Sequence, residues 1–351
     1  MKKFFATLLA LVMALSLVAC GGSKEEPAPA PADDAAAEEG AELPEIELLC
    51  AHGYPSSGDE HAAMLKAAEM LAERTDGKLT MTVHGDGTLG SEMEVCAQII
   101  AGAIDIGFSE GCAWADATGI PEMNVFGLPY LYESFSALKT AGLEIVPDAA
   151  SKVLEEGGAN LVAFQPLSGA LRSCLTTEKP IRSPEDFAGL KLRCPEIKLF
   201  SDTVSALGAN PTPIAFTEVY TAMSQGIVDG MELDAVTTRD NNLQEVIKYF
   251  TNTYHLGSLN IMCMNKDKWE SLPTEYQEIY KEVMYECISE QYDVREASMA
   301  GAVADIEAAG VEIIDFTPEQ LAQLAAQMEP VWAEYEAMGL GDIIAQLEAC
   351  E

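Results

Sequence analysis

The stretch that decides the fold is LRSCLTTEKPIRSPEDFAGLKLRCPEIKLF at residues 171–200, followed by NPTPIAFTEVYTAMSQGIVDGMEL at residues 210–233. It contains Arg172, which follows a strand-like run ending near Phe164, and Arg193, which ends the alternating segment 189–193. The chain of 351 residues has only six arginines against 57 acidic residues, so these two are not general surface charge. A guanidinium is a planar, permanently charged fork that matches a carboxylate with two hydrogen bonds. The pattern predicts an anion clamp, with ordinary salt bridges as the alternative.

The surrounding sequence resembles a known family. PIRSPEDFAGLKLR at 180–193 and PTPIAFTEVYTAMSQGIVDG at 211–230, followed by Glu232, are similar to the signature of TRAP-type (tripartite ATP-independent periplasmic) solute-binding proteins, the DctP-like family. The resemblance continues in LGSEMEVCAQIIAGAIDIGF at 89–108, VFGLPYLYES at 125–134 and YHLGSLNIMCMNKDKWESLP at 254–273. It covers nearly all of the chain from about residue 45, in the family's order and spacing.

The resemblance implies a fold and a function. The expected fold is α/β, two-lobed and periplasmic-binding-protein-like (type II), with mixed sheets, a hinge and a long helix bridging both lobes. The expected function is capture of a small organic acid in the cleft between the lobes and its delivery to a TRAP transporter permease. A binding module that serves a sensor kinase or an ABC permease is an alternative, as is an exported enzyme acting on a carboxylate.

The N-terminal segment predicts export and a lipid anchor. Lys2 and Lys3 precede an apolar run at 4–17, which ends in LVACG at 17–21 and resembles a bacterial lipobox. Residues 1–19 are therefore expected to be a signal peptide and Cys20 the lipidated residue; a plain secretory signal is the alternative. Residues 20–44 are rich in Pro, Ala and acidic residues and are expected to form a disordered tether, because they have too little apolar surface to bury. The expected location is the outer face of the cell membrane or the periplasm.

The charge of the chain limits its partners. A formal net charge of −37 at pH 7 argues against nucleic acid and anionic lipid, so membrane contact is expected only through the lipid anchor. No other stretch is apolar and long enough for a membrane-spanning helix, which assigns the transport step to a different polypeptide. An anionic solute would need a locally positive site, which again points to the two arginines. A monomer is the expected oligomeric state.

The alternation of strand-like and helical patterns predicts two lobes. Residues 46–108 read as βαβα, which predicts a mostly parallel sheet with helices on both faces. A helix predicted at 275–309 would extend about 50 Å and touch both lobes. Further helices are expected at 235–249 and 318–350. The predicted lobes comprise residues 45–169 with 258–297, and residues 170–257 with 298–351.

The resemblance assigns ligand contacts to particular positions. Arg193 matches the family arginine that forms a bidentate salt bridge to the solute carboxylate, and Arg172 matches a second arginine that supports the site. Phe216 matches an aromatic residue that packs on the ligand, with a core aromatic as the alternative. The wall beside them is expected to include residues at or next to family contact positions: Glu196, Glu232, Leu233 and Asp234. Leu233 stands where sialic-acid binders carry asparagine, so sialic acid is not the expected solute.

Three residues at the ends of predicted strands in the first lobe are candidates to close over the solute: Tyr54, Glu110 and Trp114.

One motif is rejected. Gly85, Gly87 and Gly90 form a GxGxxG with Asp105 twenty residues after the first glycine, but this acid lies between two isoleucines inside a predicted strand, where it would not read a ribose.

No catalytic motif is recognised, and the four histidines are too scattered to suggest a zinc site, so neither an enzyme, a cofactor nor a metal is expected. His255 is expected to make a structural hydrogen bond. The eight cysteines after Cys20 are expected to be small buried thiols, with a Cys174–Cys194 bridge as the alternative.

Overall fold

The computed structural model describes residues 43–350. The predicted signal peptide at 1–19, the lipidation of Cys20 and nearly all of the predicted tether at 20–44 lie outside the described residues. No helix within residues 43–350 is long and apolar enough to cross a membrane.

A single sheet of nine strands organises the fold. Eight strands follow the order β2-β1-β3-β8-β4-β7-β5-β6, and β9 pairs with β8. The strands are β1 (Ile46–Ala51), β2 (Leu79–His84), β3 (Ile106–Glu110), β4 (Leu161–Thr176), β5 (Lys191–Cys194), β6 (Asn210–Pro213), β7 (Gly230–Leu233), β8 (Tyr249–Asn265) and β9 (Glu312–Asp315).

The sheet is mixed, as expected for the fold class, and the strands of residues 46–108 are parallel to one another, as predicted. The first half, β2-β1-β3, is parallel, and so is β7-β5-β6 in the second half. The long strands β4 and β8 join the halves, and the contacts β3–β8, β8–β4 and β4–β7 are all antiparallel. The two-lobed α/β fold class with mixed strand directions is confirmed, although the strands form one sheet.

The junction of the halves is irregular. The β4–β8 ladder changes register between Phe164 and Leu167 and again between Arg172 and Cys174, while Ala170 and Tyr254 have positive φ angles of 78° and 46°. The lobe boundaries at 169/170 and 257/258 fall within this region and stay a prediction. The C-terminal helix α13 (Gly341–Glu348) packs against α4 (Phe135–Glu144) in the first half. The prediction had assigned residues 298–351, which include α13, to the second lobe.

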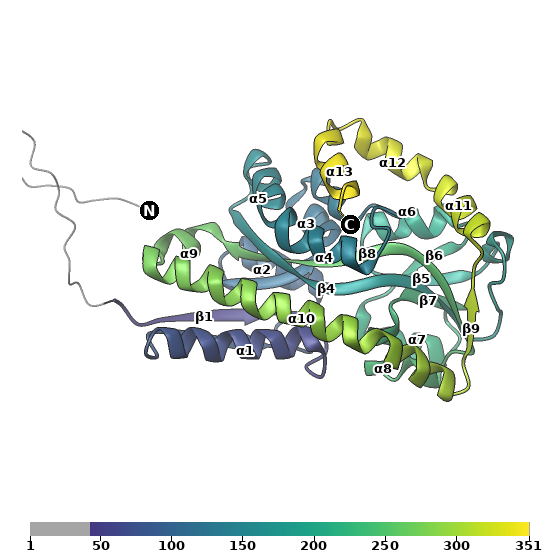
Figure 1. Ribbon diagram of the computed structural model, residues 1–351, viewed down its shortest axis with the longest axis horizontal. Helices are drawn as coiled ribbons and strands as arrows, with labels where there is room; N and C mark the ends of the chain where they lie inside the picture. The colour runs from purple at the N-terminus through teal and green to yellow at the C-terminus, as the bar shows by residue number, and fades with distance from the viewer. Residues whose placement is uncertain (1–42, 351) are drawn as a thin grey trace, which may run out of the picture. The chain divides into compact units, whose positions relative to one another are not determined.

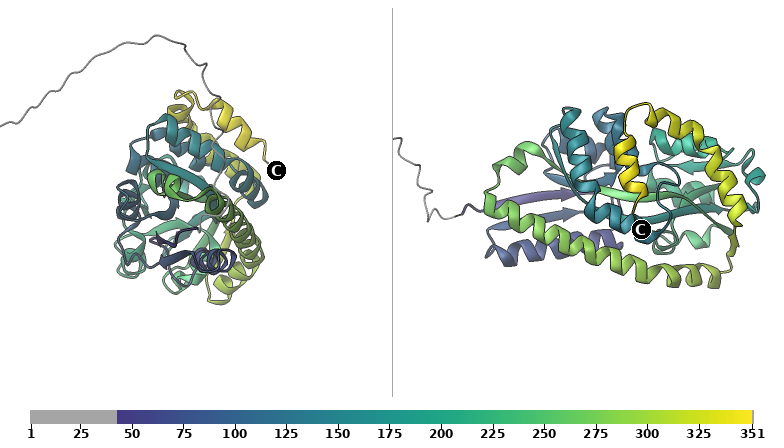
Figure 2. Two further views of the ribbon diagram at one scale, coloured as in Figure 1. Left: turned by 90° about the vertical axis from the view of Figure 1, so that its left-hand side faces the viewer. Right: turned by 45° about the horizontal axis from the view of Figure 1, so that its top comes forward.

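A long helix connects the halves on one side of the sheet. The predicted helix at 275–309 is confirmed as α10 (Thr274–Ala308), which packs against α1 (Asp59–Arg74), β4 and α8 (Ala235–Asp240). Figures 1 and 2 show α10 running beside α1 at one end and reaching α8 towards the other. α10 therefore touches elements of both halves, as expected of a bridging helix.

Most of the remaining helices cover the opposite face (Figure 1). The α-helices not yet given are α2 (Glu92–Ile100), α3 (Gly111–Thr118), α5 (Val146–Glu156), α6 (Lys198–Ala206), α7 (Val219–Ser224), α9 (Lys266–Ser271), α11 (Pro318–Gln327) and α12 (Glu329–Glu336). Short 3₁₀ turns lie at Pro121–Gly127, Pro184–Phe187, Phe216–Glu218 and Leu243–Glu245.

Two helix predictions were too long. The predicted helix at 318–350 is three helices, because Pro330 is placed in the first turn of α12 and Gly339 adopts a φ of 82° before α13. The predicted helix at 235–249 ends at Asp240, since Asn242 adopts a left-handed φ of 54°. Asparagine tolerates this conformation better than most residues.

The core comprises two apolar clusters. The larger contains the interiors of both sheet halves, and the smaller gathers side chains such as Val219, Met231 and Phe250 beneath α7 and β9. The eight cysteines of the described residues are all free, and seven of them are buried. The prediction of buried thiols is confirmed for these seven, and Cys174 and Cys194 form no bridge.

Two glycines provide a matched test of the sheet. A Cβ on Gly230 of β7 would lie 2.1 Å from the carbonyl oxygen of Leu175, whereas a Cβ on Gly301 of α10 meets nothing within 4 Å. We predict that Gly230→Ala lowers the free energy of unfolding by at least about 2 kcal/mol in urea titrations, because the backbone of β4 must shift. Gly301→Ala should raise it by about 0.5 kcal/mol or more, because glycine is unfavourable inside a helix. A Gly230→Ala variant as stable as the parent would contradict this packing.

Candidate functional site

A cavity lies where the two halves of the sheet meet. The parallel strands of the two halves run in opposite directions and pair with different parts of β4 and β8, so their carboxyl ends face one another. Such strand ends are the usual position of ligand sites in α/β proteins. The cavity is lined by Gly53, Tyr54, Glu60, Gly87, Ser91, Glu92, Met93, Glu110, Gly169, Arg172, Arg193, Pro195, Glu196, Ile197, Ala215, Phe216, Thr217, Leu233, Asp234, Thr237, Ser258 and Asn260.

Arg193 enters the cavity from β5 with its charge unpaired. Its Nε donates a hydrogen bond to the carbonyl oxygen of Ile214 at 2.8 Å, and its guanidinium carbon lies 5.8 Å from the centre of the Phe216 ring. No carboxylate of residues 43–350 lies within ion-pair distance, although the residue is only 2% exposed. Burial lowers the pKa of Arg193 to about 10, which still leaves the group charged at neutral pH. The two terminal nitrogens are therefore available to an anion in the cavity.

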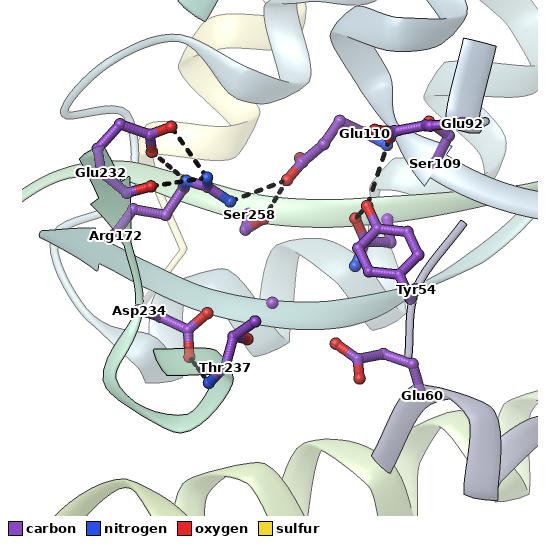
Figure 3. Close-up of polar contacts among 12 residues, drawn as sticks. Tyr54, Glu60, Glu92, Ser109, Glu110, Arg172, Glu232, Asp234, Thr237 and Ser258 are labelled. Atoms are coloured by element: carbon purple, nitrogen blue, oxygen red, sulfur yellow. Dashed lines mark hydrogen bonds and ion pairs between the residues drawn. The ribbon is translucent and has the colours of Figure 1, made fainter. Parts of the chain in front are cut away.

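Arg172 also lines the cavity, but its charge is neutralised. It makes a two-pronged contact with Glu232, through Nε to Oε2 and through Nη2 to Oε1 at 3.0 Å, and Nη2 also donates to the backbone carbonyl of Glu232 at 3.1 Å. On the other side, Nη1 lies 3.7 Å from Glu110 Oε1 (Figure 3). Burial alone would lower the pKa of Arg172, but the two carboxylates outweigh it and raise the pKa well above its usual value. Arg172 therefore belongs to a buried ion pair with Glu232 and does not offer a second unpaired charge to an anion.

The first half of the sheet contributes a cluster of hydrogen-bond acceptors. The Tyr54 hydroxyl donates to Asn260 Oδ1 at 2.6 Å and lies 3.4 Å from Glu92 Oε1. The Ser109 hydroxyl also donates to Glu92 Oε1. The ring of Tyr54 stacks on Phe108 at 5.3 Å between ring centres, which fixes the orientation of the phenol.

Glu110 lies between the acceptor cluster and Arg172 (Figure 3). It receives a hydrogen bond from the Ser258 hydroxyl and is only 6% exposed. Burial raises the pKa of Glu110 to about 7, against the opposing charge of Arg172 and the Ser258 hydrogen bond. Its carboxyl group therefore changes charge near neutral pH.

Below the cavity, Arg295 of α10 ties both halves together. It forms ion pairs with Asp59 and Glu60 at the start of α1, and its Nη1 lies 3.3 Å from Asp234 Oδ1 at the N-cap of α8. Asp234 also accepts a hydrogen bond from the Thr237 backbone N–H at 2.9 Å. Arg295 is 1% exposed, so these charges satisfy one another out of contact with bulk water.

Eight of the ten predicted contact residues line this cavity: Tyr54, Glu110, Arg172, Arg193, Glu196, Phe216, Leu233 and Asp234. Glu232 does not line it, because both of its carboxylate oxygens are engaged by Arg172. Trp114 does not line it either: it is fully buried in α3, and its indole N–H donates to the carbonyl of Ile261 at 2.9 Å. Trp114 is a core residue that anchors α3 on β8.

Several functional candidates were missed from the sequence. Glu92 at the start of α2 was hidden in the LGSEMEV segment, and Ser258 and Asn260 lie in a segment that reads as a buried strand. Arg295 lies inside the long α10 and was treated as part of a bridging helix. The scarcity of arginine, which pointed to Arg172 and Arg193, was a signal that also applied to Arg295.

The rejected GxGxxG motif has a structural role. The carboxylate of Asp105 accepts a hydrogen bond from the Leu49 backbone N–H at 2.8 Å and pairs with Lys268 at 3.3 Å, so it connects β1 with α9.

His255 is fully buried and its Nδ1 lies 2.8 Å from the Thr253 hydroxyl, which agrees with a structural hydrogen bond. Across residues 43–350, no group of three or more metal-ligating side chains is placed to hold a metal ion.

A two-lobed α/β fold with a lined cavity between opposed strand ends is suited to binding a small solute. The family described as bacterial extracellular solute-binding protein, family 7 (DctP), matches residues 50–338, and the chain belongs to this family. A solute-binding protein of Roseobacter denitrificans is 31% identical over 66% of this chain and 70% of its own length. The C4-dicarboxylate-binding periplasmic protein DctP of Rhodobacter capsulatus is 28% identical over 80% of this chain and 84% of its own length.

The structural comparison agrees. A TRAP periplasmic solute-binding protein of Roseobacter denitrificans, solved with bound β-D-glucuronate, superposes with a TM-score of 0.80 at 28% identity. The match covers 87% of this chain and all of the other. The chain is therefore an extracytoplasmic solute-binding protein of the TRAP transporter class.

The two arginines should differ in their effect on stability. Arg172→Met leaves Glu232 buried without a counter-ion, and we predict a loss of about 3–5 kcal/mol in the free energy of unfolding. Arg193→Met, which keeps the volume and removes an unpaired buried charge, should change it by no more than about 1 kcal/mol. Chemical denaturation of the solute-free variants measures both. Equal losses in the two variants would show that Arg193 is also part of a structural ion pair.

Glu110 should make stability depend on pH. Its pKa is near 4.5 in the unfolded chain and about 7 in the folded protein, so the folded state holds the proton more tightly. The stabilisation from this group is complete below pH 4.5 and is lost as the pH rises through 7, with a magnitude of about 3 kcal/mol at most. We predict that Glu110→Gln flattens the decline in stability between pH 5 and pH 8. Parallel pH profiles for the variant and the parent in urea titrations would refute this assignment.

Proposed function

We propose that the cavity captures a small organic acid by its carboxylate and that Arg193 forms the ion pair with it. The observation that supports this most strongly is the guanidinium of Arg193, which is 2% exposed yet has no protein carboxylate within ion-pair distance among the described residues. A buried charge without a partner is costly, and an anionic solute offsets that cost. The relative solved with bound β-D-glucuronate and the relative named for C4-dicarboxylates both bind carboxylates, which supports the same class of solute here.

The proposed binding mode follows from the side chains around Arg193. The nitrogens Nη1 and Nη2 hold the carboxylate, while the Nε–Ile214 hydrogen bond fixes the plane of the guanidinium. Phe216 lies against the guanidinium and packs on the solute, and Leu233 provides an apolar wall. Arg172 supports the site through its network with Glu232 and Glu110, and Glu196 borders the cavity from an exposed position.

Capture is proposed to be coupled to closure of the two lobes. The solute contacts residues from both halves, so it binds the closed arrangement more tightly and shifts the population towards it. Arg295 stabilises the same arrangement, because it pairs with Asp59 and Glu60 from one half and with Asp234 from the other. The closed form is then the species delivered to the permease.

We further propose that the protein is a lipid-anchored monomer. The lipobox ending in Cys20 and the acidic, proline-rich segment before residue 45 support a lipid anchor followed by a tether. The tether would allow the body to reach the permease at some distance from the anchor. Membrane contact is then limited to the anchor, since the strongly acidic body is repelled by anionic lipid.

Isothermal titration calorimetry with D-glucuronate tests the proposed role of Arg193. Arg193→Met should weaken binding at least about 30-fold, equivalent to about 2 kcal/mol, because the carboxylate loses its counter-ion. Arg193→Lys should also bind poorly, because an ammonium does not reproduce the two-pronged contact.

Arg182→Met is the matched control. This arginine is exposed, pairs with Glu312 and does not line the cavity, so its removal changes the net charge equally without touching the site. Its affinity should equal that of the parent protein. Unchanged affinity in Arg193→Met, in a protein that binds D-glucuronate, would refute the proposed carboxylate clamp.

A further inference from the structure

The side of the cavity formed by the first half of the sheet is an acidic wall, which we define as Tyr54, Glu60, Glu92 and Glu110. All four residues line the cavity, and Figure 3 shows them on one side of the view, with Glu232 and Asp234 on the other. Arg193 enters from β5 in the second half of the sheet. The cavity thus has one unpaired cation in its second half and a concentration of carboxylates in its first.

The acidic wall has acceptor atoms that the protein leaves uncovered. Glu92 receives its hydrogen bonds at Oε1, from the Ser109 hydroxyl and the Glu110 backbone N–H. Glu110 receives the Ser258 hydrogen bond at Oε1. No donor among residues 43–350 hydrogen-bonds to Oε2 of either carboxylate. The Tyr54 hydroxyl donates its proton to Asn260, so its oxygen can only accept a further hydrogen bond.

The arginines nearest the wall are already paired with carboxylates of the protein. Arg172 is held by Glu232 and faces Glu110, and Arg295 is held by Asp59, Glu60 and Asp234. Of the three buried arginines Arg172, Arg193 and Arg295, only Arg193 has no carboxylate partner within the described part of the chain. The cavity can therefore neutralise one carboxylate of a solute, whereas a second one placed against the wall would face the Glu92 carboxylate and further acceptor oxygens at low dielectric.

We propose that the acidic wall is a specificity-determining subsite that accepts hydrogen bonds from donor groups at the far end of the solute and excludes a second carboxylate. This inference rests on the proposed function, in which Arg193 holds the first carboxylate. The solute class is a monocarboxylate with hydrogen-bond donors opposite the carboxylate. Hydroxyl and ammonium groups share this chemistry, because both donate to carboxylate oxygens.

Two matched pairs of compounds test the proposal by calorimetry on the full-length protein. D-gluconate and D-glucarate differ only at the far end, where a hydroxymethyl group is replaced by a carboxylate; 4-aminobutyrate and succinate compare an ammonium with a carboxylate. In each pair that binds, the monocarboxylate should bind at least 100-fold more tightly. Binding of D-gluconate alone identifies hydroxyl groups as the donors, and binding of 4-aminobutyrate alone identifies an ammonium.

Variants of the wall provide a second, independent readout. Glu92→Gln and Glu110→Gln each replace a carboxyl group with an amide that can donate to a carboxylate. Each should strengthen binding of D-glucarate or succinate at least tenfold and weaken binding of the matched monocarboxylate. Glu94→Gln is the control. Glu94 lies on α2 with Glu92, is exposed and does not line the cavity, and glutamine can keep the N-terminal capping contact.

The outcomes separate this inference from the proposed function. A dicarboxylate that binds as tightly as its matched monocarboxylate, with affinity lost in Arg193→Met, overturns the acidic wall as a subsite and leaves the carboxylate clamp intact. Equal changes in Glu94→Gln and the two wall variants also overturn it, because the effect would then be one of general charge. No binding of D-glucuronate or of any of the four compounds overturns the proposed function, and this inference with it.

Discussion

The ion pair between Arg172 and Glu232 is the interaction on which the rest of the site depends. Glu232 is completely buried on β7, and Arg172 lies on the neighbouring strand β4, so each charge is stable there only because of the other. The pair occupies the point where β4 passes from one half of the sheet to the other. Arg172 is neutralised by Glu232 and lies close to Glu110. Arg193 is therefore the one cation of the cavity lining that is open to an anion.

Arg295 is a second buried arginine that is neutralised by carboxylates, and its partners come from both lobes. Its partners are a helix start in the first half and the N-cap of α8 in the second, so the long helix α10 carries a buried charge that both halves neutralise. The fold thus uses three buried arginines for three tasks. Arg172 stabilises the junction of the strands, Arg295 connects the halves, and Arg193 carries the proposed contact with the solute.

Much of the fold follows from local pattern, and much of the site from charge. The strands before residue 110 were predicted from short apolar or alternating runs, and the helix α10 from a long uninterrupted helical pattern. The joining of all strands into one sheet was not predicted, because β4 and β8 combine through pairing between residues up to about a hundred positions apart, which no local pattern records. Arg193 was predicted correctly as a cavity residue, whereas the neutralisation of Arg172 and the burial of Trp114 depend on contacts with Glu232 and Ile261 that are distant in sequence.

The seven buried cysteines give this molecule an unusual chemical property for an extracellular protein. Burial raises the pKa of thiols such as Cys50, to about 12, so almost no reactive thiolate forms in the native state. Oxidants and alkylating reagents can then reach these sulfurs only when the surrounding structure opens. The thiols therefore report unfolding, because they become reactive only where the surrounding structure opens.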